Sequence, residues 1–338
     1  MQRALLYIGN KLSNFGYTPG IIDTLGPQLE KAGYDVYYAG NKVFPILRLA
    51  QMVKVTFRLR NEVNYVLIDT YSTSAFWYAF TISFICWSLK LKYIPILHGG
   101  ALPLRLRKSK QFSWFIFTKS FANIAVSKYL ASTFLMEGYK SIVIPNNIDI
   151  TCYPFRLRRK PRPRILWVRS FHRQYNPIMA ANVIYELIKY YADVELCMVG
   201  PDKDGSLKEF RNYIKVLGVE NHVTITGLLI KEEWIELSRE YDFFINTTNV
   251  DNTPVSVIEA LGLGLAVIST NPGGIPYLLT SGQNSILVNC NDHKEMAYQI
   301  SRLVNSPDEY KQLSLKGREL AESFDWSVIK TLWTDLLK

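Results

Sequence analysis

The stretch "NTTNVDNTPVSVIEALGLGLAVISTNPGGIPYLL", residues 246–279, decides the predicted fold. It follows the apolar run "YDFFI" and passes through a loop into a segment with Val255, Ile258 and Leu261 at helical spacing. A second apolar run, "AVIST", comes after this segment. A strand, a helix and a strand in this order indicate one βαβ unit of a parallel sheet.

The same alternation covers the rest of the chain and is interrupted once. Residues 153–164, "YPFRLRRKPRPR", contain three prolines and six basic residues, which favours a linker. The length of 338 residues suits two domains. We therefore predict an α/β protein with doubly wound domains over residues 1–152 and 165–322, joined by a linker over 153–164. A C-terminal helix, 323–338, is expected to pack back on the first domain.

The charge of the chain is unevenly distributed. Residues 1–160 hold 21 Lys and Arg and 7 Asp and Glu, a net charge of +14, whereas residues 161–338 hold 18 and 22, a net charge of −4. This excess predicts an anionic partner for the first domain, unless it is only a solvated basic face. The candidate partners are nucleic acid, a membrane surface and a phosphorylated substrate.

Several features predict a cytoplasmic protein. The four cysteines are scattered and form no C-x-x-C pair, which is typical of buried thiols in a reducing compartment. The first ten residues, "MQRALLYIGN", reach a glycine too early for a signal peptide and are expected to form a strand. The segment 74–91, "SAFWYAFTISFICWSLKL", has an apolar core of about 15 residues, whereas a spanning helix needs about 20. We therefore predict a buried helix there.

Two lone carboxylates flank the start of the helix predicted within residues 246–279. Asp251 precedes the helix and Glu259 lies inside it, and Pro254 suits a first helical turn. A helix start offers free N–H groups and the positive end of the helix dipole, so it can hold a diphosphate. The carboxylates can accept hydrogen bonds from sugar hydroxyls. On spacing alone, the alternative is an Asp251 that only caps the helix and a solvated Glu259.

Other polar residues are expected where strands end, because ligands of open α/β sheets bind at the carboxyl ends of the strands. His98 ends the run "YIPILHGG", and the two glycines after it let a ligand approach the backbone closely. Arg169 and Arg173 follow the first strand of the second domain, and a guanidinium can bind phosphate oxygens bidentately.

The residues 251–276 resemble the signature of the family 4 retaining glycosyltransferases, which have the GT-B fold. The shared pattern is an acid, seven residues, "EA", a Gly-containing turn, a strand and "GGIP". Further similar segments are "YIPILHGG", "VSKYLA", "VIPNNID", "HVTITG" and "FDWSVIKTLWTDLLK", and together they cover nearly the whole chain. The resemblance implies two Rossmann-like domains facing a central cleft. It also implies transfer of a sugar from a nucleotide-diphosphate sugar to a glycan or lipid-linked acceptor, as in bacterial surface polysaccharide or glycolipid synthesis.

The resemblance also implies roles for individual residues. Glu259 would bind the ribose of the donor, Asp251 the hydroxyls of the transferred sugar, and His98 would lie near that sugar. These three form the expected catalytic set. The residues expected to bind the donor lie in turns after strands and at the helix start: Gly16, Gly99, Gly100, Arg169, Arg173, Gly227, Asn252, Thr253, Val255 and Ser256.

The chain departs from the family pattern at two places. Asp251 stands where the family has Glu and is one methylene shorter. In "WVRSFHRQYNP", Arg169 and Ser170 occupy the positions of the usual Gly-Arg pair, and Tyr175 falls where a Lys is expected. Arg169 and Arg173 remain as the phosphate ligands of this loop.

Absent motifs narrow the function classes further. No G-x-x-x-x-G-K-[ST] occurs, and His172, His222 and His293 lack the spacing of metal ligands. We therefore predict no metal and no cofactor beyond the nucleotide sugar.

Cations and aromatics interleave in "LPLRLRKSKQFSWFIF", which favours peripheral binding to an anionic membrane, expected at the cytoplasmic face of the inner membrane. Two alternatives remain open, a non-catalytic module that binds RNA or another anionic polymer, and an epimerase or phosphorylase on the same fold. No RNA-binding signature is present, and no nucleic-acid partner is predicted.

Overall fold

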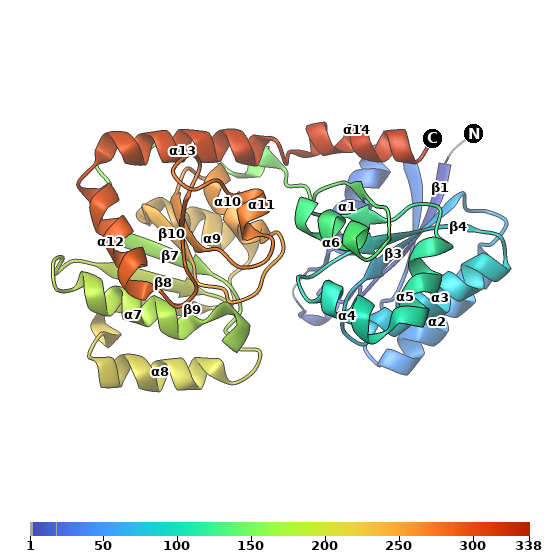
Figure 1. Cartoon of the computed structure of the whole chain (residues 1–338), viewed down its shortest axis with the longest axis horizontal. Helices are drawn as coiled ribbons and strands as arrows, with labels where there is room; N and C mark the ends of the chain where they lie inside the picture. The colour runs from blue at the N-terminus through green and yellow to red at the C-terminus, as the bar shows by residue number, and fades with distance from the viewer. Residues whose placement is uncertain (1–2, 18) are drawn as a thin grey trace. The chain divides into compact units, whose positions relative to one another are not determined.

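The computed structural model describes residues 3–17 and 19–338, which divide into two compact units. The chain up to Asn147 forms the first unit together with Trp326–Lys338, and Ile148–Asp325 form the second (Figure 1). Each unit contains a parallel sheet of six strands. The predicted doubly wound α/β architecture is confirmed.

The sheet of the first unit has the strand order β2-β1-β3-β4-β5-β6, and all its neighbouring strands are parallel. Its strands are β1 (Arg3–Ile8), β2 (Tyr34–Ala39), β3 (Tyr65–Thr70), β4 (Lys92–Leu97), β5 (Ile124–Ala125) and β6 (Ile142–Val143). Strands such as β3 are buried on both faces, as parallel sheets between helices require.

Helices cover both faces of this sheet. One core joins the strands to side chains of α1, α6 and α14, and the other joins them to α2 and α3. The helices of the unit are α1 (Ile21–Lys31), α2 (Pro45–Arg58), α3 (Ala75–Ser88), α4 (Leu102–Lys108), α5 (Lys110–Thr118), α6 (Lys128–Met136) and α14 (Trp326–Leu336). Helix α14 contributes Ile329 and Trp333 to the first of these cores.

Helix α3 is buried on one face only, whereas we predicted a buried helix for this segment. Phe76, Ala79, Ile82 and Cys86 are buried, whereas aromatic side chains on the opposite face remain about half exposed. Within the part of the chain that the structure describes, no helix is both long enough and apolar enough to cross a membrane.

The sheet of the second unit has the order β12-β11-β10-β7-β8-β9 and is also parallel throughout. Its strands are β7 (Arg164–Val168), β8 (Glu195–Val199), β9 (Val223–Gly227), β10 (Phe243–Asn246), β11 (Ala266–Thr270) and β12 (Ile286–Val288). Because β7 lies between β10 and β8, the strand order reverses direction at β7 and β10, where open α/β sheets bind ligands.

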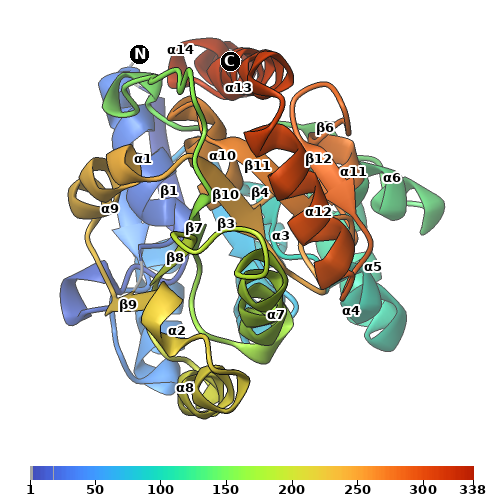
Figure 2. The ribbon, with the colours of Figure 1, turned by 90° about the vertical axis from the view of Figure 1, so that its left-hand side faces the viewer.

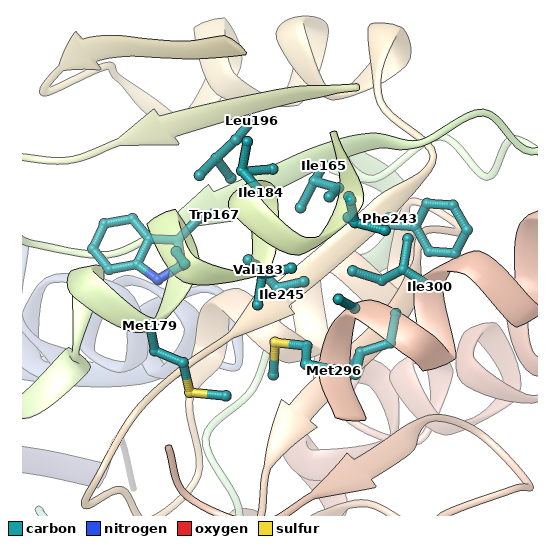
Figure 3. Packing of buried hydrophobic residues seen from close by; sticks show 14 of the residues in the cluster. Ile165, Trp167, Met179, Val183, Ile184, Leu196, Phe243, Ile245, Met296 and Ile300 are labelled. Atoms are coloured by element: carbon teal, nitrogen blue, oxygen red, sulfur yellow. The ribbon is translucent and has the colours of Figure 1, made fainter. Parts of the chain in front are cut away.

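Two cores hold the second unit together, one on each face of its sheet. In the core of Figure 3, side chains of β7 and β10 meet Met179 and Val183 of α7 and Met296 and Ile300 of α12. The helices of the unit are α7 (Pro177–Leu187), α8 (Ser206–Leu217), α9 (Lys231–Leu237), α10 (Val255–Gly262), α11 (Ile275–Leu278), α12 (His293–Val304) and α13 (Pro307–Glu322). Helices α7 and α12 are in direct contact, and Figure 2 shows both on the same side of the sheet. Helices α9 and α10 line the core of the opposite face.

Short 3-10 turns complete the secondary structure of both units. They are Ser13–Phe15, Ile150–Cys152, Arg173–Tyr175, Glu220–His222 and Ser238–Glu240.

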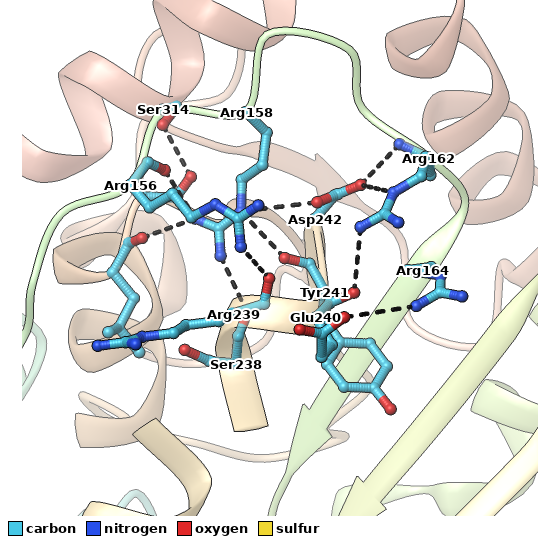
Figure 4. Close-up of polar contacts among 12 residues, drawn as sticks. Arg156, Arg158, Arg162, Arg164, Ser238, Arg239, Glu240, Tyr241, Asp242 and Ser314 are labelled. Carbon is cyan, nitrogen blue, oxygen red and sulfur yellow. Dashed lines mark hydrogen bonds and ion pairs between the residues drawn. The ribbon is translucent and has the colours of Figure 1, made fainter. Parts of the chain in front are cut away.

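Residues 153–164, which we expected to be a linker, instead belong to the second unit. Arg158 is buried and donates hydrogen bonds to the carbonyl oxygens of Tyr241 (3.0 Å), Leu263 (2.7 Å) and Ser238 (3.0 Å). Its guanidinium also lies 3.7 Å from the buried carboxylate of Asp242 (Figure 4). The prolines and the charge suggested an exposed connection, but these three carbonyls, the carbonyl of Arg156 and a carboxylate satisfy the buried guanidinium.

Candidate active site

The loops after β7 and β10 lie side by side at the carboxyl ends of their strands. The amide of Asn249 donates to the Gln174 carbonyl (2.8 Å), and the Gln174 side chain donates to the Val250 carbonyl (2.8 Å). The Thr247 hydroxyl donates to the Tyr175 carbonyl (2.7 Å). The reversal of strand order therefore brings together the two loops that the sequence separates by about 75 residues.

Helix α10 starts directly after the second of these loops, with free backbone donors. Pro254 precedes Val255 as the N-cap residue, and no side chain caps the helix. The first N–H groups of a helix have no intrahelical partner and attract anions. In the described part of the chain, the buried hydroxyl of Ser256 also has no hydrogen-bond partner. Val255 and Ser256 therefore lie where a bound anion would meet unpaired donors.

Asp251 forms an ion pair with Arg169 across the two loops. The amide of Asn252 also donates to the Asp251 carboxylate (2.8 Å). The ring centre of Tyr175 lies 4.6 Å from the Arg169 guanidinium, within cation–π distance. Tyr175, which falls at the family's Lys position, therefore supports Arg169. The buried Nε of Arg169 has no partner among the described residues.

The glycines of the segment "NPGGIP" let the next loop pass against the backbone of Asp251 and Asn252. The amide of Gly274 donates to the carbonyl of Asp251 (3.0 Å). A Cβ atom on Gly273 would collide with the carbonyl oxygen of Asp251, and one on Gly274 with that of Asn252. Gly273 also has a φ of 59°, which favours glycine. Sterics therefore require glycine at both positions.

Glu259 is buried in α10 and is held by two residues that our sequence reasoning missed. The Tyr153 hydroxyl donates to its Oε1 (2.5 Å), and Lys231 Nζ lies 2.9 Å from the same oxygen. Burial raises the pKa of Tyr153, and the negative charge of Glu259 raises it further, so the phenol keeps its proton. The alternative of a solvated Glu259 is therefore wrong.

The remaining predicted residues of this unit lie in three places. Asn252 and Thr253 belong to the loop that leads into α10, and Asn252 is buried. Gly227 ends β9, and its carbonyl accepts from the amide of Gly200 at the end of β8 (2.8 Å). Arg173 is exposed and pairs with Glu209 of α8 (2.5 Å), so the structure does not join it to Asp251.

In the first unit, His98 follows β4 within a buried polar cluster. Its Nε2 lies 3.0 Å from Oδ1 of Asp69, and the Tyr7 hydroxyl donates to the same oxygen (3.0 Å). The ring of Tyr71 stacks on the imidazole at 4.8 Å. Because a carboxylate only accepts hydrogen bonds, Nε2 carries the proton, and Nδ1 of a neutral imidazole is left as an acceptor.

The three glycines predicted in this unit differ in conformation. Gly16 ends a 3-10 turn at φ 80°, and Gly99 follows His98 at φ 82°. Open space surrounds the Cα of both, so a ligand could approach their backbone. Gly100 lies directly before α4, and its φ is not in the left-handed region.

Metal ligands do not cluster in the second unit around Asp251 or elsewhere among the described residues. No group of three or more His, Cys, Asp or Glu residues within residues 3–17 and 19–338 could hold a metal ion. The positive charge at the loop pair comes from the guanidinium of Arg169 and from the N-terminal end of α10.

Comparison with known proteins assigns this loop pair to a family. Residues 162–306, which contain β7, β10 and α10, match the family described as glycosyl transferases group 1. This segment is similar to the group 1 glycosyltransferases. The resemblance to glycosyltransferases that we inferred from the motifs is therefore confirmed. The retaining stereochemistry and the roles of the site residues stay predictions.

The similarity to known glycosyltransferases extends beyond the matched residues 162–306. An uncharacterised glycosyltransferase of Haemophilus influenzae is 24% identical over 373 aligned positions that cover 100% of both chains. An uncharacterised glycosyltransferase of Methanocaldococcus jannaschii is 25% identical over 249 residues, which are 70% of this chain and 66% of that protein. The chain thus spans just under two thirds of the second relative.

Solved structures establish the GT-B fold of this glycosyltransferase. The Anabaena protein HepE in complex with UDP-glucose superimposes with a TM-score of 0.78 at 17% identity, with 99% of each chain covered. At this identity the likeness shows the fold alone. The predicted GT-B architecture is confirmed.

Three residues that contact predicted site residues within their own unit were missed by our sequence reasoning: Asp69 in the first unit, and Tyr153 and Lys231 in the second. Asp69 had a weak signal, because it is the one acid in the buried run "YVLIDT". Tyr153 lay in the segment that we interpreted as a linker, and Lys231 is one of many charged residues at a helix start. The last two had no pattern that could distinguish them from surface residues.

Proposed function

We propose that this chain transfers a sugar, with retention of configuration, from a nucleotide-diphosphate sugar to a hydroxyl of a glycan or lipid-linked acceptor. The observation that carries the proposal is the Arg169–Asp251 pair beside the uncapped start of α10. The family match and the complex of HepE with UDP-glucose support this class of donor. Synthesis of bacterial surface polysaccharide or glycolipid is the proposed setting.

The reaction requires stabilisation of the leaving diphosphate. The bond from the anomeric carbon to the β-phosphate oxygen breaks, a bond to the acceptor oxygen forms, and the proton of the acceptor hydroxyl passes to the departing diphosphate oxygen. Negative charge grows on the diphosphate, and fixed positive groups stabilise that charge. We assign this role to the guanidinium of Arg169 and to the first amides of α10, including those of Val255 and Ser256. The reaction is proposed to need no metal and no further cofactor.

In this proposal, the two carboxylates accept hydrogen bonds from hydroxyl groups of the donor. Asp251, now paired with Arg169, would accept from hydroxyls of the transferred sugar once phosphate competes for the guanidinium. Glu259 would accept from the ribose, oriented by Tyr153 and Lys231. In the first unit, His98 would accept a hydrogen bond from a sugar hydroxyl at Nδ1, in the orientation that Asp69 fixes.

A donor screen tests the class of substrate. Thermal shifts are measured with nucleotide diphosphates and their sugars, and one nucleotide series is expected to stabilise the chain. At a concentration 100 times its dissociation constant, a donor should add about 2.7 kcal/mol to the free energy of unfolding. The absence of a shift with every nucleotide sugar would contradict the proposal.

Arg169→Ala and Arg173→Ala are a matched pair for testing the site. Both residues lie in the loop after β7, but only Arg169 meets Asp251, whereas Arg173 pairs with Glu209. We expect Arg169→Ala to lower kcat by roughly 10²- to 10³-fold, the usual cost of a lost electrostatic donor. Arg173→Ala should retain full activity, because the proposal gives no phosphate role to Arg173, although the sequence suggested one. Equal losses of kcat in the two variants would contradict the role assigned to Arg169.

Product analysis tests the remaining parts of the proposal. Nuclear magnetic resonance of the glycoside should show the anomeric configuration of the donor, and turnover should persist in EDTA. Incubation of donor without acceptor separates transfer from epimerisation. Accumulation of an epimer in that reaction would favour the epimerase alternative.

A further inference from the structure

Helices α3 and α5 carry a row of aromatic side chains, of which Phe80 packs against the core and the tryptophans remain about half exposed. On α3, Trp77, Phe80, Phe84 and Trp87 recur at a helical spacing that keeps them on one face, opposite the buried face of Ala79, Ile82 and Cys86. They meet two rings of α5: Phe80 lies 4.8 Å from Phe112, and Phe84 and Trp87 lie 5.8 and 5.6 Å from Phe115.

These rings form an open surface rather than a sealed core. Trp77, Phe84, Trp87 and Trp114 are 43–52% exposed. A groove of about 590 Å³ runs between the two helices, lined by Phe80, Phe84, Lys110, Gln111, Phe112, Trp114 and Phe115. We call this set, with Trp77 and Trp87, the α3–α5 aromatic surface. Contiguous exposed apolar groups of this kind mark interaction sites.

The charge around the α3–α5 aromatic surface has one sign. From Thr70 to Met136 the sequence contains eight Lys and Arg and no Asp or Glu. Lys90, Lys110 and Lys119 are exposed, and no ion pair joins them to any residue that the structure describes. Lys119 Nζ lies 5.2 Å from the ring centre of Trp114, so a cation and an exposed ring share one location. The first acid after this range is Glu137, and its carboxylate pairs with Arg107 of α4 rather than with these lysines.

We propose that the α3–α5 aromatic surface docks onto the interface of an anionic phospholipid bilayer. Tryptophan and phenylalanine side chains partition into the boundary between headgroups and acyl chains, and unpaired lysines beside them attract anionic headgroups. The rings would enter the interface while the helices stay parallel to it, since α3 and α5 are too short to span the bilayer. Charge complementarity favours this occupant over a second copy of the chain, because the surface would then meet its own positive charge.

This inference deepens the proposed function, because it names the surface at which a lipid-linked acceptor would be met. The docking proposal depends on the proposed function only for the nature of the acceptor, since bilayer binding needs no donor. Bilayer docking and sugar transfer can therefore be disproved separately.

Flotation with vesicles tests the docking directly. The full chain is mixed with vesicles of phosphatidylcholine alone, or of phosphatidylcholine with phosphatidylglycerol, at low and high salt. Binding is expected only to the anionic vesicles and is expected to fall with salt, because screening weakens the lysine contribution. Equal binding to both kinds of vesicle, or to neither, would overturn the proposal.

Two double variants separate the aromatic and the basic contributions. F84S/W114S removes two exposed rings, and K110E/K119E reverses two unpaired charges. Each is expected to weaken vesicle binding at least about tenfold, since one surface charge contributes on the order of fivefold. The matched controls are Y190S/Y298S and K208E/K215E, exposed residues of the second unit, which should bind as the unchanged chain does. Thermal unfolding and the donor-induced thermal shift show that each variant is folded.

Self-association is the competing outcome. Light scattering is run on the unchanged chain and on F84S/W114S. A dimer that the variant abolishes, without vesicle binding, would show that a second copy covers this surface and would contradict the proposal. Loss of the donor-induced shift with normal vesicle binding would instead count against the proposed function alone.

Discussion

Asp69 shows how a single residue acquires its role from the register of the sheet. It lies 29 positions before His98, and no sequence spacing links the two. Strands β3 and β4 are neighbours in the sheet, and the amide of His98 donates to the carbonyl of Thr70. The register therefore places the carboxylate beside the imidazole. Gly9 leaves room for it, since a Cβ there would fall 2.5 Å from Asp69 Oδ2.

Asp69→Asn is predicted to impair catalysis through His98. The amide oxygen can still accept from Tyr7 and His98, but it lacks the negative charge of the carboxylate, so both hydrogen bonds weaken and the imidazole is held less firmly. We expect kcat/KM to fall about tenfold or more, because a hydrogen bond to a charged group contributes roughly 1.5–3 kcal/mol. The measurement is steady-state kinetics, with kcat and KM reported separately.

The exposed Asp193→Asn is the control for the Asp69 variant and should leave the rate unchanged. The thermal shift induced by the nucleotide diphosphate alone should be normal in both variants, since the residues proposed to bind it lie in the second unit and Asp69 does not. If Asp69→Asn has unchanged kinetics, His98 does not depend on this carboxylate.

At the scale of elements, α10 and the loop before it are held by a neighbouring loop. The segment 271–274 passes against the backbone of Asp251 and Asn252, and its glycines allow that approach. The strand-loop-helix-strand order was predicted correctly, because hydrophobic periodicity is a local property. The contact between the loops was not predicted, since it depends on how two turns meet at one end of the sheet.

Gly274→Ala is predicted to disturb the loop that carries Asp251. The added methyl group would meet the carbonyl oxygen of Asn252, and backbone cannot move aside as a side chain can. We expect a loss of roughly 1–3 kcal/mol in the free energy of unfolding, as for other overpacked sites. Chemical denaturation measures this loss, and the donor-induced thermal shift should shrink in parallel.

Gly20→Ala is the matched control for this variant. Gly20 has an extended backbone with φ −90°, and a Cβ there meets only ordinary van der Waals contacts. Its stability and donor binding should stay close to those of the unchanged chain. Equal effects in the two variants would show that the collision at Gly274 is not the cause.

At the scale of the whole molecule, the division of the chain differs from our prediction in the segment that we expected to be a linker. The contacts place the boundary between Asn147 and Ile148 and assign residues 153–164 to the second unit. Local composition predicted a linker there, because prolines and unpaired charges are common in exposed connections. The buried contacts of Arg158 with three backbone carbonyls come from elements about 80 to 105 residues away.

Arg158→Met is predicted to destabilise the second unit. It removes the guanidinium donor from the carbonyls of Tyr241, Leu263 and Ser238 and weakens the pairing of the buried Asp242. Breaking a buried pair by removing one partner costs about 3–5 kcal/mol. Denaturant unfolding followed by circular dichroism should show a lower midpoint. Arg159→Met, at the exposed neighbouring position, should unfold as the unchanged chain does. Similar midpoints for both would mean that residues 153–164 contribute little to the unit.

The sequence by itself determined the α/β class, the two parallel sheets and the position of the helix start after Asp251. These depend on the local periodicity of apolar residues and on turn residues. Only the tertiary structure decided which polar groups meet: Arg169 with Asp251, Lys231 and Tyr153 with Glu259, and Asp69 with His98. Each pair joins different elements, so strand order and register determine these contacts, and neither can be deduced from one segment.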